Sequence, residues 1–297
     1  MPRVDGFKRV PALCCALIVM AFSLALAEPL RVIAIGAHPD DSEGKSAGTA
    51  MLWVAAGAEV QFISVTNGDA GHQSEGGGAL ARRRAAESMR SAEILGVSWK
   101  TLGFHDGELE PTLEARKAVI RAIREWRADI VIAHRPNDYH PDHRYTGQIV
   151  QDAAYMAAVP NVCPETPRLA KNPVFMYFSD RFKKPNPFSP DVVVDITPVI
   201  ERKIRAIAEM DSQMFEWLPW IGGRDLSTIP GDKEGRFKWM MEHRGRARTG
   251  ADNPYYEQLV ARYGKAHADK VEHVEAFELC EYGRQVSRGE LWEMFPR

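Results

Sequence analysis

The sequence has little excess charge and no internal repeats or low-complexity tracts, and each absence excludes a class of protein. Its 297 residues contain 38 Lys and Arg against 40 Asp and Glu, which gives a formal net charge of −2. This balance does not favour a nucleic-acid binder, because such binding depends on neutralising phosphates. A content of 45% hydrophobic residues is too high for a disordered chain, and the composition differs from collagen and from a coiled coil.

Cysteine is also scarce. Cys14 and Cys15 lie in an apolar N-terminal run, and only Cys163 and Cys280 lie beyond it. The last two are far apart and lack the CxxC or Cys/His spacing of a structural zinc site. They could pair in an oxidising compartment or remain as buried free thiols, and the sequence leaves both alternatives open.

The N-terminal segment has the pattern of an export signal. Three basic residues among the first nine precede an uncharged run over residues 10–27, which ends in small residues at Ala27. This order is typical of a secretory signal peptide cleaved after Ala27. We therefore expect 28–297 to be a single exported domain, periplasmic or extracellular, without a stable membrane span. The alternative is an uncleaved anchor, although Pro11 and Ser23 interrupt a run that is short for a bilayer.

From residue 30 onward, short β-branched apolar runs alternate with segments of helical spacing. The expected strands cover 30–36, 60–66, 101–104, 130–133, 174–178 and 192–196, and the expected helices cover 48–56, 79–95, 112–126, 145–158 and 198–210. Thr112 and Gly96 are expected to cap two of the helices. The order predicts an α/β fold with a mostly parallel sheet and helices on both faces. The periodicity fades after 218, so 218–297 is expected to form an irregular C-terminal extension of the same domain.

Two loops with the same His-Pro-Asp sequence follow the first and fourth expected strands. The first contains His38 and Asp41, and the second contains His140 and His143. The carboxyl ends of parallel strands meet at one edge of a sheet, where α/β proteins bind their ligands. His38 and Asp41 could converge from one stiff turn, and His143 could supply a third ligand. Two imidazoles and one carboxylate with an open position are typical of a catalytic zinc site.

The other charged residues of the two loops fit catalytic roles. Asp40 could take a proton from water, and a protonated His140, held by Asp142, could stabilise an oxyanion. A purely structural interpretation is also open, because Asp40 and Asp41 could simply cap a helix and lone surface histidines are common. The recurrence of the motif at two strand ends favours the metal site.

Both loops resemble the signature motifs of the LmbE/PIG-L family of zinc-dependent N-acetylglucosaminyl de-N-acetylases. The resemblance covers about 30–215. It is carried by Ala37-His38-Pro39-Asp40-Asp41 with Glu43, Gly48 and Thr49, by His140-Pro141-Asp142-His143, and by Asn67-Gly68-Asp69, Arg84-x-x-Glu87, Asp106-Gly107-Glu108-Leu109 and Asp195-Ile196-Thr197.

The resemblance implies a Rossmann-like fold and the hydrolysis of an N-acetyl group on an N-acetylglucosamine-type sugar or glycoconjugate, with release of acetate. It also implies that His38, Asp41 and His143 are the zinc ligands and that Asp40 is the general base. Another divalent metal is compatible with the same residues.

The remaining carried-over roles concern the oxyanion and the substrate. The resemblance makes His140 the imidazolium that stabilises the oxyanion, oriented by Asp142, and it places Arg84 at a position that contacts substrate in some members. The chain departs from the family at two positions: Asp138 stands where some members have Tyr, and Asp211 stands where a His often occurs. Both departures concern substrate contacts and leave the expected metal ligands intact.

Three other functions remain open from the sequence. The same site could hydrolyse an ester or a different amide, two His and one carboxylate also occur in non-haem Fe(II) oxygenases, and the chain could bind glycans without catalysis. The expected partner is a small-molecule or glycan substrate. The Gly- and Asn-rich segment 67–78 could be a mobile substrate loop or merely a solvated one. Trp217, Trp220 and Trp239 could stack on sugar rings or pack internally.

Overall fold

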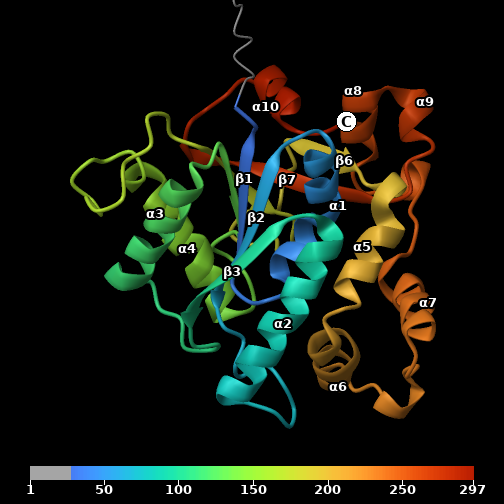
Figure 1. Cartoon of the computed structure of the whole chain (residues 1–297). Helices are drawn as coiled ribbons and strands as arrows, with labels where there is room; N and C mark the ends of the chain where they lie inside the picture. Colours follow the sequence, from blue (N-terminus) through green and yellow to red (C-terminus); the bar gives the residue numbers. More distant parts are fainter. Residues whose placement is uncertain (1–27) are drawn as a thin grey trace, which may run out of the picture.

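The computed structural model describes residues 28–297 (Figure 1). The predicted signal peptide lies outside the described residues, so export remains a prediction. Among residues 28–297, no helix combines the length and the apolar character needed to cross a membrane.

The fold is built on one seven-stranded sheet. Its strands are β1 (Arg31–Gly36), β2 (Glu59–Thr66), β3 (Ser98–Phe104), β4 (Ile130–Ala133), β5 (Val174–Phe178), β6 (Val192–Asp195) and β7 (Val274–Gly283), in the order β3-β2-β1-β4-β5-β7-β6. The first five strands are mutually parallel, and β7 is antiparallel to both β5 and β6. This arrangement confirms the predicted α/β fold with a mostly parallel sheet.

Helices cover both faces of the sheet, as Figure 1 shows. On one face, α1 (Asp41–Ala55), α2 (Gly77–Leu95) and α5 (Ile200–Ile207) pack together, and on the other face α3 (Leu113–Trp126) packs against α4 (Pro141–Met156). Because β1 is buried on both sides, its residues form a continuous apolar run rather than an alternating pattern.

The predicted caps of α3 and α2 are both confirmed. The side chain of Thr112 accepts a hydrogen bond from the backbone N–H of Ala115 at the start of α3. Gly96 ends α2 with a φ of 78°, a left-handed conformation that glycine adopts without steric cost.

Two helices begin earlier than the periodicity indicated. α1 begins at Asp41 rather than at 48, and α4 begins at Pro141 rather than at 145. Proline fits the first turn of α4 because its missing N–H would have no intrahelical acceptor there. Each His-Pro-Asp motif therefore leads directly into a helix, which fixes its side chains more firmly than a free loop would.

The segment 218–297 is far more regular than expected. It forms α6 (Leu218–Ile221), α7 (Lys233–Arg244), α8 (Tyr256–Tyr263), α9 (Lys265–Ala268) and α10 (Arg288–Met294) as well as β7, and a π-helical turn (Ser212–Trp217) precedes it. β7 lies between β5 and β6, so it is an internal strand of the main sheet. Glu275 is buried on β7 and pairs with Lys203 of α5, and this inward charge obscured the strand pattern.

The two cysteines of the described residues are both buried and unpaired. Of the two alternatives that the sequence left open, the structure has the free thiols.

Candidate metal centre and catalytic site

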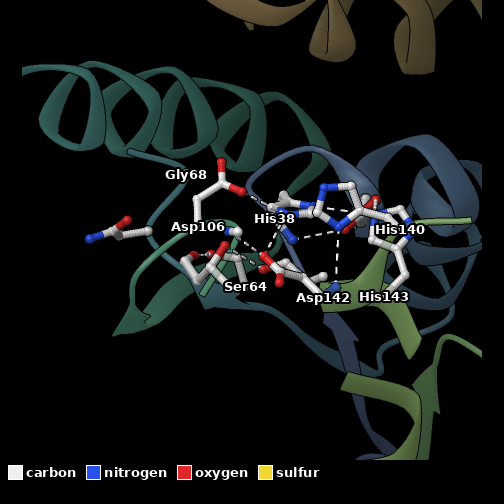
Figure 2. A network of polar contacts seen from close by, with 12 residues as sticks. His38, Ser64, Gly68, Asp106, His140, Asp142 and His143 are labelled. Carbon is white, nitrogen blue, oxygen red and sulfur yellow. Dashed lines mark hydrogen bonds and ion pairs between the residues drawn. The ribbon is translucent and has the colours of Figure 1, made fainter. Parts of the chain in front are cut away.

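The carboxyl ends of β1, β3 and β4 bring the candidate residues to one edge of the sheet. His38 follows β1, Asp106 follows β3, and His140, Asp142 and His143 lie at the start of α4 after β4. Figure 2 shows His38 at the centre, with Asp106 on one side and the imidazoles of His140 and His143 on the other.

The turn between β1 and α1 holds its side chains through an unusual backbone. Asp40 has a φ of 129°, which is rare for a residue other than glycine and costs conformational energy. One carboxylate oxygen of Asp41, Oδ2, accepts a hydrogen bond from the backbone N–H of His38 at 2.8 Å. The turn therefore directs His38 and Asp41 to one point, as their spacing predicted.

Two histidine nitrogens and the carboxylate of Asp41 meet there. His38 Nδ1 lies 3.2 Å from His143 Nε2, His143 Nε2 lies 3.4 Å from Asp41 Oδ1, and His38 Nδ1 lies 3.6 Å from Asp41 Oδ2. Tetrahedral zinc with bonds of 2.0–2.1 Å separates its ligand atoms by about 3.3 Å. The two imidazole nitrogens have the spacing of zinc ligands and the Asp41 carboxylate lies close to both, so the predicted triad could hold a metal ion such as zinc.

The outer nitrogen of His38 faces two carboxylates. His38 Nε2 lies 3.0 Å from Asp106 Oδ1 and 3.2 Å from Asp142 Oδ2. Burial by itself would lower the pKa of His38, but hydrogen bonds to Asp106, Asp142 and Asp41 raise it well above its usual value. The two outer carboxylates thus keep a proton on Nε2 and leave Nδ1 directed at the triad.

The position of Asp142 differs from the expected one. Its side chain is fully buried, and Oδ2 accepts a hydrogen bond from the N–H of Gly107 at 2.7 Å as well as contacting His38. Asp142 contacts His140 through its backbone and not through its carboxylate. Its N–H donates to His140 Nδ1 at 3.2 Å, and this hydrogen bond caps α4. Asp142 therefore positions His38 more directly than it positions His140.

Three residues that were not among the predicted site residues contact the triad, and one of them, His134, was expected to support it from a strand end. Asp106 contacts His38 as described, Asp138 Oδ1 lies 3.2 Å from His143 Nδ1, and His134 Nε2 lies 3.2 Å from Asp41 Oδ2. The ring of His134 also stacks on that of His143, with centroids 4.2 Å apart. All three residues follow strand ends, and this position was the sequence signal that could have identified them. Which ligand each one contacts depends on how the strands pair, and the sequence does not show that.

Asp40 lies beside the triad and is not needed as a ligand. Burial raises its pKa to about 6, and the charge of Arg84 opposes the rise. The two side chains are 3.8 Å apart, between Arg84 Nη2 and Asp40 Oδ2. A carboxylate with a pKa in this range is suited to exchanging protons near neutral pH.

Burial lowers the pKa of His140, and the neighbouring His38 and His143 lower it further. This direction opposes the imidazolium form that the family resemblance implied. The backbone N–H of Asp142 donates to His140 Nδ1, so Nδ1 must be an acceptor. A neutral His140 therefore carries its proton on Nε2.

Arg84 lies beneath the site and is almost completely buried. Its guanidinium donates to the carbonyl oxygens of Gly68 at 3.1 Å and Pro39 at 2.9 Å, and it reaches Asp106 Oδ2 at 3.4 Å. Arg84 therefore ties together the turns after β1, β2 and β3. Its Nη1 and Nη2 atoms have partners in the protein, whereas Nε has none among the described residues, and its expected role in contacting substrate remains a prediction.

The segment 67–78 and the π-helical turn form the rim above Asp106. His72 is buried and lies 2.8 Å from Glu216, and Gln213 donates to the carbonyl of Gly71 at 2.9 Å. The rings of Trp217 and Trp220 stack beside this contact with centroids 5.6 Å apart, and 47% of Trp220 is exposed. The segment is thus attached to the rim at two points, and an exposed aromatic pair adjoins it.

The chain is similar to several known proteins. A family profile described as GlcNAc-PI de-N-acetylase matches residues 33–154. The chain is 36% identical over 222 residues to the diacetylchitobiose deacetylase of Thermococcus kodakarensis, which covers 69% of this chain and 79% of the relative. It is 28% identical over 187 residues to the mycothiol S-conjugate amidase of Streptomyces coelicolor, which covers 54% of this chain and 64% of the relative.

Solved structures show the same fold. The N,N'-diacetylchitobiose deacetylase of Pyrococcus horikoshii matches with a TM-score of 0.62 at 25% identity, over 85% of this chain and 84% of that one. A 4-carboxy-2-hydroxymuconate hydratase of Pseudomonas putida matches with a TM-score of 0.65 at 19% identity, over 87% of this chain and 99% of that one. Because a hydratase shares the fold, the reaction must be argued from the site residues.

Proposed function

The chain belongs to the PIG-L (LmbE-like) family, whose relatives include deacetylases and amidases, and from this premise we propose that it is a zinc-dependent hydrolase that removes the acetyl group from an N-acetylglucosamine-type sugar. The observation that carries the proposal is the convergence of His38, Asp41 and His143 with Asp40 beside them. The similarity to a diacetylchitobiose deacetylase supports the choice of a sugar acetamide.

His38, Asp41 and His143 would hold the zinc ion. When bound, zinc supplies Lewis-acid polarisation of the acetamide carbonyl and increases the acidity of water. The two carboxylates at His38 Nε2 orient that ligand, and Asp138 does the same for His143.

Asp40 accepts a proton from the attacking water and delivers it to the departing nitrogen. A C–O bond forms at the acetyl carbon, the amide C–N bond breaks, and acetate and a free amine result. Asp40 suits this role because its carboxylate is adjacent to the ligands, and Arg84 keeps it in place.

His140 stabilises the oxyanion that develops on the acetyl oxygen. Its Nδ1 is occupied by the N–H of Asp142, so Nε2–H is the donor that remains for substrate. A neutral imidazole can make this hydrogen bond, so the role does not require the imidazolium form.

The stacked Trp217 and Trp220 supply a surface for the sugar ring. Aromatic faces pack well against the apolar faces of pyranose rings, and the pair lies on the rim next to Gly71. We also propose that the enzyme acts outside the cytoplasm as the single domain 28–297, which rests on the signal-peptide pattern of residues 1–27.

The proposal is tested by incubating zinc-loaded protein with N-acetylglucosamine, its oligosaccharides and other N-acetylated sugars while acetate is measured. Metal analysis of the purified protein accompanies the assay, and His38→Ala should abolish bound zinc. Acetate release from at least one N-acetylated sugar is the expected result. Bound zinc without acetate across the panel, together with cleavage of an acetyl ester, would instead identify an esterase.

A further inference from the structure

A cavity lies at the same edge of the sheet as the candidate metal centre. Its volume is about 470 Å³, and its lining includes Gly44 of α1, Ile196 after β6 and His273 before β7. Because β6 runs parallel to β1, the end of β6 lies at the same sheet edge as the end of β1. The N–H of Gly44 donates to the carbonyl of Asp40 at 2.8 Å, so the cavity adjoins the catalytic turn.

The cavity has one apolar wall and one basic wall. Isoleucines of α5 and its approach form the apolar wall: Ile196, Ile200, Ile204 and Ile207. The basic wall consists of Arg244, Arg246 and Arg248, which alternate along the irregular segment after α7.

The three arginines carry positive charge that the surrounding protein does not neutralise. Within residues 28–297, no hydrogen bond or ion pair forms at the guanidinium groups of Arg244, Arg246 or Arg248, whereas Lys203 is committed to Glu275. The carboxylate among the lining residues is that of the half-exposed Glu272. A concave surface with an excess of positive charge attracts anions. Guanidinium groups also match the geometry of carboxylate and phosphate.

Arg244 also connects the basic wall to the reaction centre. Arg244 and Gly44 line the same cavity, and the N–H of Gly44 donates to the carbonyl of Asp40, so the basic wall extends toward the turn that holds Asp40.

We propose that the cavity is a subsite for an acidic saccharide unit next to the N-acetylated sugar. This inference rests on the proposed function and names its substrate class. The carboxylate or phosphate of the neighbouring unit would bind Arg246 and Arg248, and its apolar ring face would pack against the isoleucines of α5. The preferred substrates are then acidic N-acetylated glycans rather than neutral chito-oligosaccharides.

The test compares two disaccharides of the same linkage, N-acetylglucosamine joined to glucuronic acid and N-acetylglucosamine joined to glucose. We expect zinc-loaded wild-type protein to show a kcat/KM about tenfold higher for the acidic disaccharide, as close charge pairs in binding sites provide. The preference should decrease as salt is added. The double variant R246Q/R248Q should bring the ratio of the two kcat/KM values close to one.

Arg121→Gln is the matched control. Arg121 is a partly exposed arginine on α3, on the opposite face of the sheet, where it pairs with Glu165. This variant should keep the wild-type ratio. Thermal unfolding of each variant shows whether it is folded, and the salt dependence of the wild-type ratio decides the question if the double variant is not.

Each other result overturns a specific statement. Equal kcat/KM values for the two disaccharides in wild-type protein overturn the subsite and leave the deacetylase intact. Absence of acetate from every N-acetylated sugar overturns the proposed function and the subsite with it. Inorganic phosphate that raises turnover of the neutral disaccharide to the acidic level would show that the cavity binds a free anion as an activator.

Discussion

The contact between Asp142 and His38 leads to a prediction that separates two roles for one carboxylate. The family resemblance assigned Asp142 to orient His140, whereas the structure places Oδ2 at 3.2 Å from His38 Nε2. Asp142→Asn removes the negative charge and can retain an oxygen at the Oδ2 position, where the N–H of Gly107 donates at 2.7 Å. The substitution therefore changes charge with little change in shape.

We expect Asp142→Asn to weaken zinc binding by about tenfold, or about 1.4 kcal/mol. Removing the carboxylate that contacts a metal-binding histidine lowers the metal affinity by about tenfold to a hundredfold. The lower value applies here because Asp106 Oδ1 remains at 3.0 Å from the same nitrogen. Asp106→Asn with Asp142→Asn should therefore cost more than the sum of the two single substitutions.

The measurement is a zinc titration in competition with a chelator of known affinity, together with kcat at saturating zinc. Asp152→Asn is the control, because Asp152 lies on the same helix but is exposed and pairs only with Arg116. A zinc affinity of Asp142→Asn within twofold of wild type, combined with a large loss of kcat, would refute our reasoning. It would return Asp142 to the role of orienting His140.

Three further substitutions test other parts of the structure. Asp40→Asn should retain zinc and lower kcat by about 10²- to 10⁴-fold, since it removes the proton acceptor, and an active variant would exclude Asp40 as the base. Trp220→Ala should raise KM for N-acetylated oligosaccharides more than it lowers kcat, because an exposed stacking surface is lost; unchanged steady-state kinetics would exclude this surface. Glu275→Ala should lower the free energy of unfolding by about 3–5 kcal/mol, because it leaves Lys203, now 2.6 Å from Glu275 Oε1, buried without a counter-charge. Urea unfolding measures this loss, and a change no larger than that of the exposed control Glu272→Ala would contradict it.

The convergence of the three proposed metal ligands could be predicted from the sequence because their geometry is largely local. His38 and Asp41 lie on one turn, and His143 follows a neighbouring strand, so the strand order alone brings them to one edge. The partners of these ligands were harder to predict. Asp106 reaches His38 only because β3 lies two strands from β1, and no local pattern specifies that distance.

The C-terminal strand was missed for a different physical reason. β7 contains Glu275 facing inward, where it pairs with Lys203 and accepts the N–H groups of Gly48 and Thr49. A buried charge with three partners from distant segments looks, in the sequence, like a break in an apolar run. Hydrophobic periodicity therefore missed a strand whose buried residues include a charge held by long-range polar pairing as well as the apolar Ala276 and Phe277.

The candidate metal centre and the residues proposed to bind substrate come from different parts of the chain. The family profile ends at residue 154, and His38, Asp40, Asp41, Asp106, His140, Asp142 and His143 all lie within it. The stacked tryptophans and the three arginines of the basic wall lie beyond it, between residues 217 and 248. Relatives named for chitobiose and for mycothiol conjugates match the chain at 36% and 28% identity, over 69% and 54% of its length. If one catalytic centre serves chemically different acetamides and amides, the segments around it must select among them, so exchanging 217–248 between relatives should transfer substrate preference without moving a metal ligand.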